Sequence, residues 1–254
     1  MGRREIDNQI VERIIKLPTS PTVIRGTTPV ISFGDFTSSS LATLSINPSS
    51  REFLQGSKLI KTGKKRLVDK ESLGIDLDEP LREEHAEAIW QGCRNYFGAY
   101  ANPLDWFDDL NEVLSRISRK YDDRDTCHVD LVQSATFPAW RGLTQKDQQH
   151  LIDEDFEFFK YQTSMPNLEV LLVNGRQVLE QLKITPGFNV ETVDVMFFDV
   201  AEKKVPTSLF KGTGPHGKLV LGWTGTLKSL HISAPVRADL YSRLGEWLKQ
   251  EIGK

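Results

Sequence analysis

The chain has 254 residues, of which 39% are apolar and 26% charged, and its formal net charge is −3. A chain of this length and apolar content can bury the core of one large α/β domain or of two small ones. The slightly acidic balance excludes a surface that is basic overall, so any contact with nucleic acid must come from a local patch.

Cysteine content and hydropathy further narrow the class of protein to which the chain can belong. The two cysteines, Cys93 and Cys127, lie far apart in the sequence and have no metal-ligand spacing. This argues against a disulfide framework and against a four-cysteine iron–sulfur cluster, and it suits a reducing cytosol. The sequence contains no recognisable signal peptide or membrane-spanning stretch, so we expect a cytoplasmic protein without a membrane partner.

Helical and strand patterns alternate along the first two thirds of the chain. In chain order, hydrophobic periodicity and capping residues predict a helix at 4–16, short strands at 30–33 and 41–46, a helix at 78–98, a helix from Asn102 to Ile117, a strand at 127–132, a helix at 144–161, a strand at 168–173 and a helix at 176–182. Such alternation indicates a mostly parallel sheet with right-handed crossovers and with helices on both faces.

The last third of the chain has a different pattern. Polar or Gly/Pro-rich turns separate β-branched and aromatic runs at 192–200, 205–210 and 218–223. We interpret these runs as a small β insertion. A last core strand is expected at 227–230, and a C-terminal helix is expected to begin at Pro235.

These elements together predict one domain over residues 1–254, with an N-terminal helical arm at 1–25 and the β insertion at 186–224. The expected fold is a three-layer α/β/α sandwich with a central, mostly parallel four-stranded sheet and the small β insertion.

Two polar residues stand directly after predicted strands. Asn47 follows the strand at 41–46, and His231 follows the strand at 227–230. In an open α/β sheet, ligands bind in the crevice outside the carboxyl ends of the strands. The chain has no Gly-x-Gly-x-x-Gly and no Walker A lysine motif, so no dinucleotide or nucleoside triphosphate site is predicted. Asn47 and His231 are therefore the leading candidates for functional residues.

Four short segments near these strand ends resemble, in order, motifs of the uracil-DNA glycosylase superfamily. Ser45-Ile46-Asn47-Pro48-Ser49 resembles its Gly-hydrophobe-Asn-Pro-Gly motif, and His231-Ile232-Ser233 resembles its His-Pro-Ser motif. Between them, Val129-Asp130-Leu131-Val132-Gln133 stands where the family often has Thr-Asn-hydrophobe-Val-Lys, and Val173-Asn174-Gly175-Arg176 resembles a strand leading into a helix that begins with glycine. The likeness spans about residues 30–250.

The chain departs from these motifs at several positions. Ser45 and Ser49 replace two glycines, and Ile232 replaces the proline after the histidine. Glycines at such positions let the backbone approach a flipped nucleotide and its phosphates closely. The floor of the pocket is therefore expected to differ from that of the family.

The resemblance implies a monofunctional DNA glycosylase, which hydrolyses the N-glycosidic bond of a flipped, damaged or modified base. Asn47 would hold the attacking water through its amide, and His231 would stabilise the departing base. The expected partner is double- or single-stranded DNA, the expected state is a monomer, and neither a metal nor a cofactor is required. Further expected roles are stacking on the base for Phe53, phosphate contacts for Ser49, Ser50 and Ser233, and a wedge that fills the vacated stack for Pro235, Val236 and Arg237.

Asp130 stands where the resemblance places an asparagine that recognises the uracil edge. An ionised carboxylate only accepts hydrogen bonds, so it would be repelled by O4 of uracil but could accept from N4 of cytosine. We therefore expect a base with an exocyclic amine, such as cytosine or a modified cytosine. Superfamily glycosylases that attack modified phage cytosines in antiviral defence are one precedent. The alternative is a structural role for Asp130, as a helix cap or as the partner of an arginine.

A local basic patch follows the first motif. No acidic residue occurs between Phe53 and Val68, whereas five basic residues crowd together there: Lys58, Lys61, Lys64, Lys65 and Arg66. Such a run suits phosphate contacts whose affinity falls with salt, although a charge run can also be only a solvated face. A second basic loop, at 212–218, could also approach a strand.

Two other functions remain open on the sequence alone. The replaced glycines favour a catalytically inactive module of the same fold that binds DNA or a base. An unrelated α/β enzyme acting on a small nucleotide or acyl substrate is the other alternative, and it is disfavoured because the chain has no Gly-x-Ser-x-Gly nucleophile elbow.

Overall fold

The computed structural model describes residues 6–61, 64–98, 103–200, 203–225, 227 and 232–253. The chain divides into two compact units. Unit 1 comprises Met1–Asp35, Ile46–Pro103 and Val129–Gln162, and unit 2 comprises Phe36–Ser45, Leu104–His128 and Thr163–Lys254. Each unit is assembled from three separate stretches of chain.

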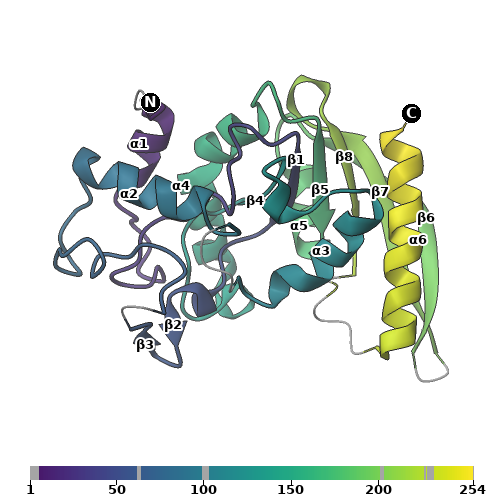
Figure 1. Cartoon of the computed structure of the whole chain (residues 1–254), viewed down its shortest axis with the longest axis horizontal. Helices are drawn as coiled ribbons and strands as arrows, with labels where there is room; N and C mark the ends of the chain where they lie inside the picture. The colour runs from purple at the N-terminus through teal and green to yellow at the C-terminus, as the bar shows by residue number, and fades with distance from the viewer. Residues whose placement is uncertain are drawn as a thin grey trace. The chain divides into compact units, whose positions relative to one another are not determined.

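The main sheet has six strands in the order β4-β1-β5-β8-β7-β6 (Figure 1). The strands are β1 (Leu41–Ser45), β4 (Thr126–Asp130), β5 (Val170–Asn174), β6 (Asn189–Val200), β7 (Lys203–Thr213) and β8 (Leu219–Trp223). All of them belong to unit 2 except for the last two residues of β4.

Four neighbouring strands run in the same direction. β1 pairs in parallel with β5, and β5 pairs in parallel with β8. β4 also runs alongside β1, because Leu41 N–H donates to Asp125 O (3.2 Å) at the start of the pair and Val132 N–H donates to Ile46 O (2.8 Å) just beyond its end. The described side chains of these strands are almost all buried, as expected for a parallel sheet covered on both faces. The predicted four-stranded parallel core is therefore confirmed.

The fourth core strand is not the one that the sequence predicted. β8, at Leu219–Trp223, pairs with β5, whereas Leu227 belongs to no strand and residues 228–231 lie outside the described part of the chain. The sequence places 218–223 in the insertion, because a short apolar run has the same local pattern in either place. Gly222 lets β8 approach β5 closely, since a Cβ at this position would clash with Val173 O of β5.

The β insertion is a long hairpin that extends the same sheet. β6 and β7 pair antiparallel over most of their length, and β7 pairs antiparallel with β8. β6 is thus an edge strand of the main sheet. The insertion lengthens the sheet and does not form a separate one.

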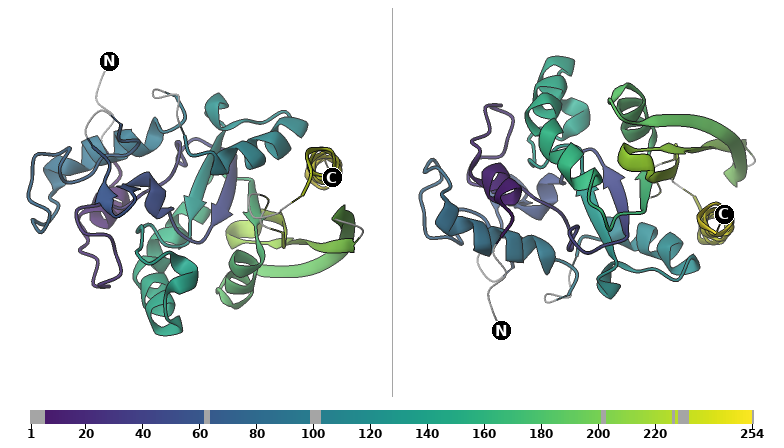
Figure 2. Two further views of the ribbon diagram at one scale, coloured as in Figure 1. Left: turned by 90° about the horizontal axis from the view of Figure 1, so that it is seen from below. Right: turned by 90° about the horizontal axis from the view of Figure 1, so that it is seen from above.

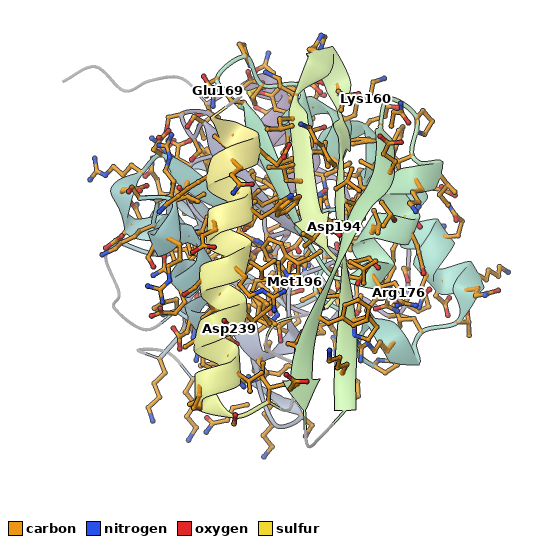
Figure 3. The ribbon with its side chains drawn as sticks, turned by 90° about the vertical axis from the view of Figure 1, so that its right-hand side faces the viewer. Lys160, Glu169, Arg176, Asp194, Met196 and Asp239 are labelled. Atoms are coloured by element: carbon orange, nitrogen blue, oxygen red, sulfur yellow. The ribbon has the colours of Figure 1, made fainter. Side chains whose placement is uncertain are left out.

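Helices cover both faces of the main sheet. Figure 2 shows α3 (Trp106–Arg116) and α6 (Ala234–Ile252) on one face and α5 (Arg176–Ile184) on the other. Figure 3 shows α6 running alongside β6, where Met196 is labelled and is 8% exposed. Arg243 of α6 fixes this contact by donating to Phe197 O at 2.7 Å. Unit 2 therefore has the predicted three layers.

Unit 1 contains α1 (Asn8–Ile15), α2 (Glu83–Arg94), all but the last residue of α4 (Gln145–Thr163), and a short hairpin of β2 (Leu54–Gln55) and β3 (Lys58–Leu59). The predicted helices at 4–16, 78–98 and 144–161 correspond to these three helices, with different ends. Thr144 caps α4 as expected, because Asp147 N–H donates to Thr144 Oγ1 at 3.2 Å. Among the described residues, short 3₁₀ turns occur at Ser50–Glu52, Tyr121–Asp123, Trp140–Gly142 and Pro215–Gly217.

The predicted strand at 30–33 is wrong. The segment is buried and forms no strand: Phe33 makes only an isolated bridge, and Val30 N–H donates to Gln133 O (2.8 Å). Its apolar pattern reflects burial inside unit 1, and burial alone does not distinguish a strand from an irregular segment.

None of the helices in the described part of the chain has the length and apolar character needed to cross a membrane.

Candidate functional site

The order of strands in the sheet reverses at β1, because the next core strands along the chain lie on opposite sides of it. The chain passes from β1 to β4 on one side and then returns to β5 on the other side of β1. Such a switch point is where open α/β sheets bind ligands, outside the carboxyl ends of the strands. Asn47 follows the last residue of β1, Ser45, by two positions. The predicted catalytic asparagine therefore stands at the place that the topology favours.

The amide of Asn47 is held in one orientation. Its Nδ2 donates to Ser134 O at 3.3 Å and to Thr136 Oγ1 at 3.2 Å. A backbone carbonyl only accepts, so the nitrogen and not the oxygen must face Ser134. Among the described residues, none donates to Oδ1 of Asn47, and the side chain is only partly buried. Its carbonyl oxygen is therefore oriented and available to accept from a water molecule.

A buried ion pair supports the segment that holds Asn47. Arg13 of α1 pairs with Asp155 of α4 at 2.8 Å, and both side chains are more than nine-tenths buried. Gln133 N–H donates to Asp155 Oδ2 at 2.7 Å, and Arg13 Nε donates to Gln133 Oε1 at 3.1 Å. The pair thus satisfies the backbone N–H and the side-chain oxygen of Gln133, the residue before Ser134. The sequence gives no sign of this pair, because its two partners come from helices that lie far apart along the chain.

Asp130 and Glu52 are two buried carboxyl groups in unit 1. Asp130 ends β4 and is 3% exposed, and Glu52 ends the 3₁₀ turn after Asn47 and is 2% exposed. Tyr96 donates its hydroxyl to Glu52 Oε1 at 2.8 Å. Glu52 could not be singled out from the sequence, since a glutamate between Arg51 and Phe53 carries no local sign of burial.

Burial raises the pKa of the Glu52 carboxyl to about 7. The Tyr96 hydrogen bond and the positive charge of Arg66 lower this pKa, while the negative charge of Asp130 raises it. Glu52 therefore changes its charge near neutral pH, beside a residue that we expect to contact the base. Such perturbed groups gather at functional sites.

We expect Glu52→Gln to stabilise the protein above neutral pH. Below pH 4.5 the carboxyl is protonated in both states, but between pH 4.5 and about 7 only the unfolded state loses its proton, so wild-type stability falls as pH rises. The full loss amounts to about 3 kcal/mol, at about 1.4 kcal/mol for each pH unit between the two pKa values. Urea denaturation from pH 4 to pH 8 measures this, and the advantage of Glu52→Gln should appear only as the pH rises.

Glu157→Gln is the matched control, because Glu157 lies on α4 with its side chain 80% exposed. Its effect should stay within about 0.5 kcal/mol at every pH. An advantage of Glu52→Gln that is the same at pH 4 and pH 8 would contradict the assignment of the raised pKa.

The other residues expected near the first motif have varied surroundings. Phe53 is 2% exposed and packs in the core of unit 1. Ser49 is exposed and caps the 3₁₀ turn by accepting from Arg51 N–H at 3.2 Å, and Ser50 is half-buried. Their roles toward a base or a phosphate stay predictions.

The four lysines predicted to contact DNA differ in their exposure to solvent. Lys58, Lys61 and Lys64 are exposed. Lys65 is mostly buried and pairs with Asp69 at 2.7 Å and with Glu71 at 2.5 Å. Because these pairs already satisfy its charge, Lys65 is the least suited of the four to meet a phosphate.

The second motif is described only in part. His231 lies outside the described residues. Ser233 is exposed and stands as the N-cap residue of α6, and Arg237 of α6 pairs with Asp109 of α3 at 3.2 Å. The ion pair gives Arg237 a structural partner within unit 2, and its predicted contact with DNA is untested.

No group of three or more His, Cys, Asp or Glu side chains suited to a metal ion occurs in the part of the chain that the structure describes.

A scan against models of known protein families finds no match to this chain, and a search of curated proteins finds no significant match. The likeness to the uracil-DNA glycosylase superfamily therefore depends on the four short motifs, and function has to be argued from the residues themselves.

Proposed function

We propose that the protein is a monofunctional DNA glycosylase that acts on a flipped base in DNA. Water would add to the anomeric carbon of the sugar, and the bond between that carbon and the base nitrogen would break. Both electrons of this bond leave on the base, which then takes up a proton. The reaction requires a positioned water and a group that stabilises the leaving base.

The observation that carries this proposal is the orientation of Asn47. Its Nδ2 is fixed by Ser134 and Thr136, which turns Oδ1 into a fixed acceptor at the end of β1. An amide oxygen can align a water without itself being a strong base. This suits the cleavage of a glycosidic bond, in which positive charge builds up on the sugar and a weak nucleophile is sufficient. His231 is assigned to the leaving base from the motif alone.

The proposed substrate is a base with an exocyclic amine. Asp130 ends the strand next to β1, and Val132, two residues later, donates its N–H to Ile46, the residue before Asn47. Its position and acceptor chemistry favour a cytosine-type edge over a uracil edge. We further propose that the protein acts as a cytoplasmic monomer.

The test is release of bases from oligonucleotides that contain uracil, cytosine or modified cytosines, followed by alkali to cleave abasic sites. We expect the wild type to release an amine-bearing base, and we expect Asp130→Asn to shift the preference by about 10-fold or more toward uracil, since each good base contact contributes about 1–3 kcal/mol. Asp153→Asn, on the exposed face of α4, is the control and should leave the preference unchanged.

Each other outcome has a distinct meaning. The same base preference in wild type and Asp130→Asn removes the assignment of Asp130. DNA binding without any released base supports the inactive module of the same fold. Neither binding nor release points to a different α/β enzyme.

A further inference from the structure

An exposed aromatic residue lies one position beyond the segment that holds Asn47. Phe137 is 62% exposed, and Pro138 and Ala139 after it are also exposed. The residues on either side are buried: Thr136 is 1% exposed and Trp140 is 9% exposed. The chain therefore forms an apolar tip that projects from unit 1.

Contacts on both sides of the tip hold its backbone in place. Thr136 forms a β-bridge with Val23, and Phe137 N–H donates to Thr22 O at 2.9 Å. On the other side, Trp140 belongs to an apolar cluster that includes Val132 and Leu151, and Ile46 packs against it. A large apolar side chain on such a rigid base keeps its exposed position at little entropic cost.

The tip is joined to Asn47 by a direct contact. Thr136 Oγ1 accepts from Asn47 Nδ2 at 3.2 Å, and Phe137 is the next residue. Arg141, four residues after Phe137, is exposed, and none of the carboxylates in the described ranges forms an ion pair with it. One short segment therefore combines a contact to the proposed catalytic residue, a projecting aromatic ring and an arginine with an uncommitted charge.

We propose that Phe137 is the wedge that enters duplex DNA and fills the space left by the everted base, with Arg141 contacting a flanking phosphate. This inference rests on the proposed glycosylase function. A flat apolar ring replaces the stacking that the neighbouring bases lose, and it slows the return of the flipped base. An arginine beside it neutralises phosphate charge and so adds affinity that depends on salt.

This wedge replaces the one predicted at Pro235-Val236-Arg237. Pro235 is exposed but small, Val236 and Arg237 are half-buried, and the guanidinium of Arg237 is paired with Asp109 at 3.2 Å. Phe137 presents the larger stacking surface and is 62% exposed.

The test compares binding to two duplexes of the same sequence, one fully paired and one with a central tetrahydrofuran abasic site that leaves the gap open. We expect the wild type to prefer the gapped duplex, and we expect Phe137→Ala to lower affinity for it by about 10-fold to 100-fold, as for the loss of one stacking contact. Phe137→Trp should retain the preference. Ile184→Ala is the matched control, because Ile184 is 71% exposed and lies on α5.

The outcomes separate the inference from the function. Wild-type base release together with unchanged gap binding by Phe137→Ala overturns the wedge and leaves the glycosylase proposal standing. Loss of gap binding in Val236→Ala but not in Phe137→Ala assigns the wedge to α6 and also overturns the inference. A wild type that binds neither duplex and releases no base overturns both proposals.

Discussion

Replacing Asn47 with alanine is expected to lower the rate of base release by about 100-fold to 1,000-fold, the usual effect of losing one oriented polar group at a reacting centre. The substitution removes Oδ1, the proposed acceptor for the attacking water, and the two hydrogen bonds to Ser134 and Thr136. Affinity for DNA should change much less, because the charged and stacking contacts remain. Single-turnover rates and binding constants on the same duplex measure the two effects separately.

Asn95→Ala is the control for this prediction. Asn95 is exposed at the end of α2, where its amide donates to Gln91 O at 2.9 Å, and its loss should leave the rate unchanged. Asn47→Ala with a wild-type rate would remove Asn47 from the mechanism. If the rate and the affinity fell together, the residue would act in binding.

Replacing Asp155 with alanine is expected to destabilise the protein by about 3–5 kcal/mol, because it leaves the Arg13 guanidinium buried without its counter-charge. The same change removes the acceptor of Gln133 N–H, which lies 2.7 Å from Asp155 Oδ2. Since Gln133 precedes Ser134, the segment that orients Asn47 should loosen, and base release should fall further than stability alone explains. Urea denaturation gives the first quantity, and rates measured well below the unfolding transition give the second.

Two further variants test whether the unpaired charge of Arg13 causes the loss of stability. Asp153→Ala changes an exposed carboxylate on the same helix, which accepts from Gln149 at 2.8 Å, and should cost no more than about 0.5 kcal/mol. The double variant Arg13→Met with Asp155→Leu should recover most of the stability, because an apolar pair of similar size needs no counter-charge. A double variant as unstable as Asp155→Ala would show that the unpaired charge is not responsible, and would assign the loss to packing or to the missing acceptor of Gln133 N–H.

Periodicity and capping located most of the helices and three of the four core strands. The helix at 144–161 could be predicted because Thr144 and Asp147 form a local cap, which is a property of neighbouring residues. The fourth strand could not, since Leu219–Trp223 resembles the runs of the adjacent hairpin and only its pairing with β5 makes it a core strand. The segment at 30–33 has the apolar pattern of a strand because burial produces that pattern whether or not a ladder forms.

Fewer residues of the candidate site than elements of the fold could be predicted from the sequence. Asn47 and Asp130 could be singled out because each ends an apolar run and belongs to a short recognisable motif. Glu52 and the Arg13–Asp155 pair could not, because charged residues within amphipathic or polar segments give no sign that they are buried. Phe137 was equally inconspicuous, since phenylalanine is among the residues most often buried in a core.

Local information in the sequence thus determined the kinds of element, their order along the chain and the polar residues that close the strands. Only the tertiary structure decided which apolar run became the fourth parallel strand, which carboxyl groups lost their water, and which aromatic side chain was left facing solvent. The physical reason is the separation along the chain over which each kind of interaction acts. Helix caps and hydrophobic periodicity depend on residues within a few positions of one another, whereas strand pairing, burial of charge and exposure depend on segments that meet only after folding.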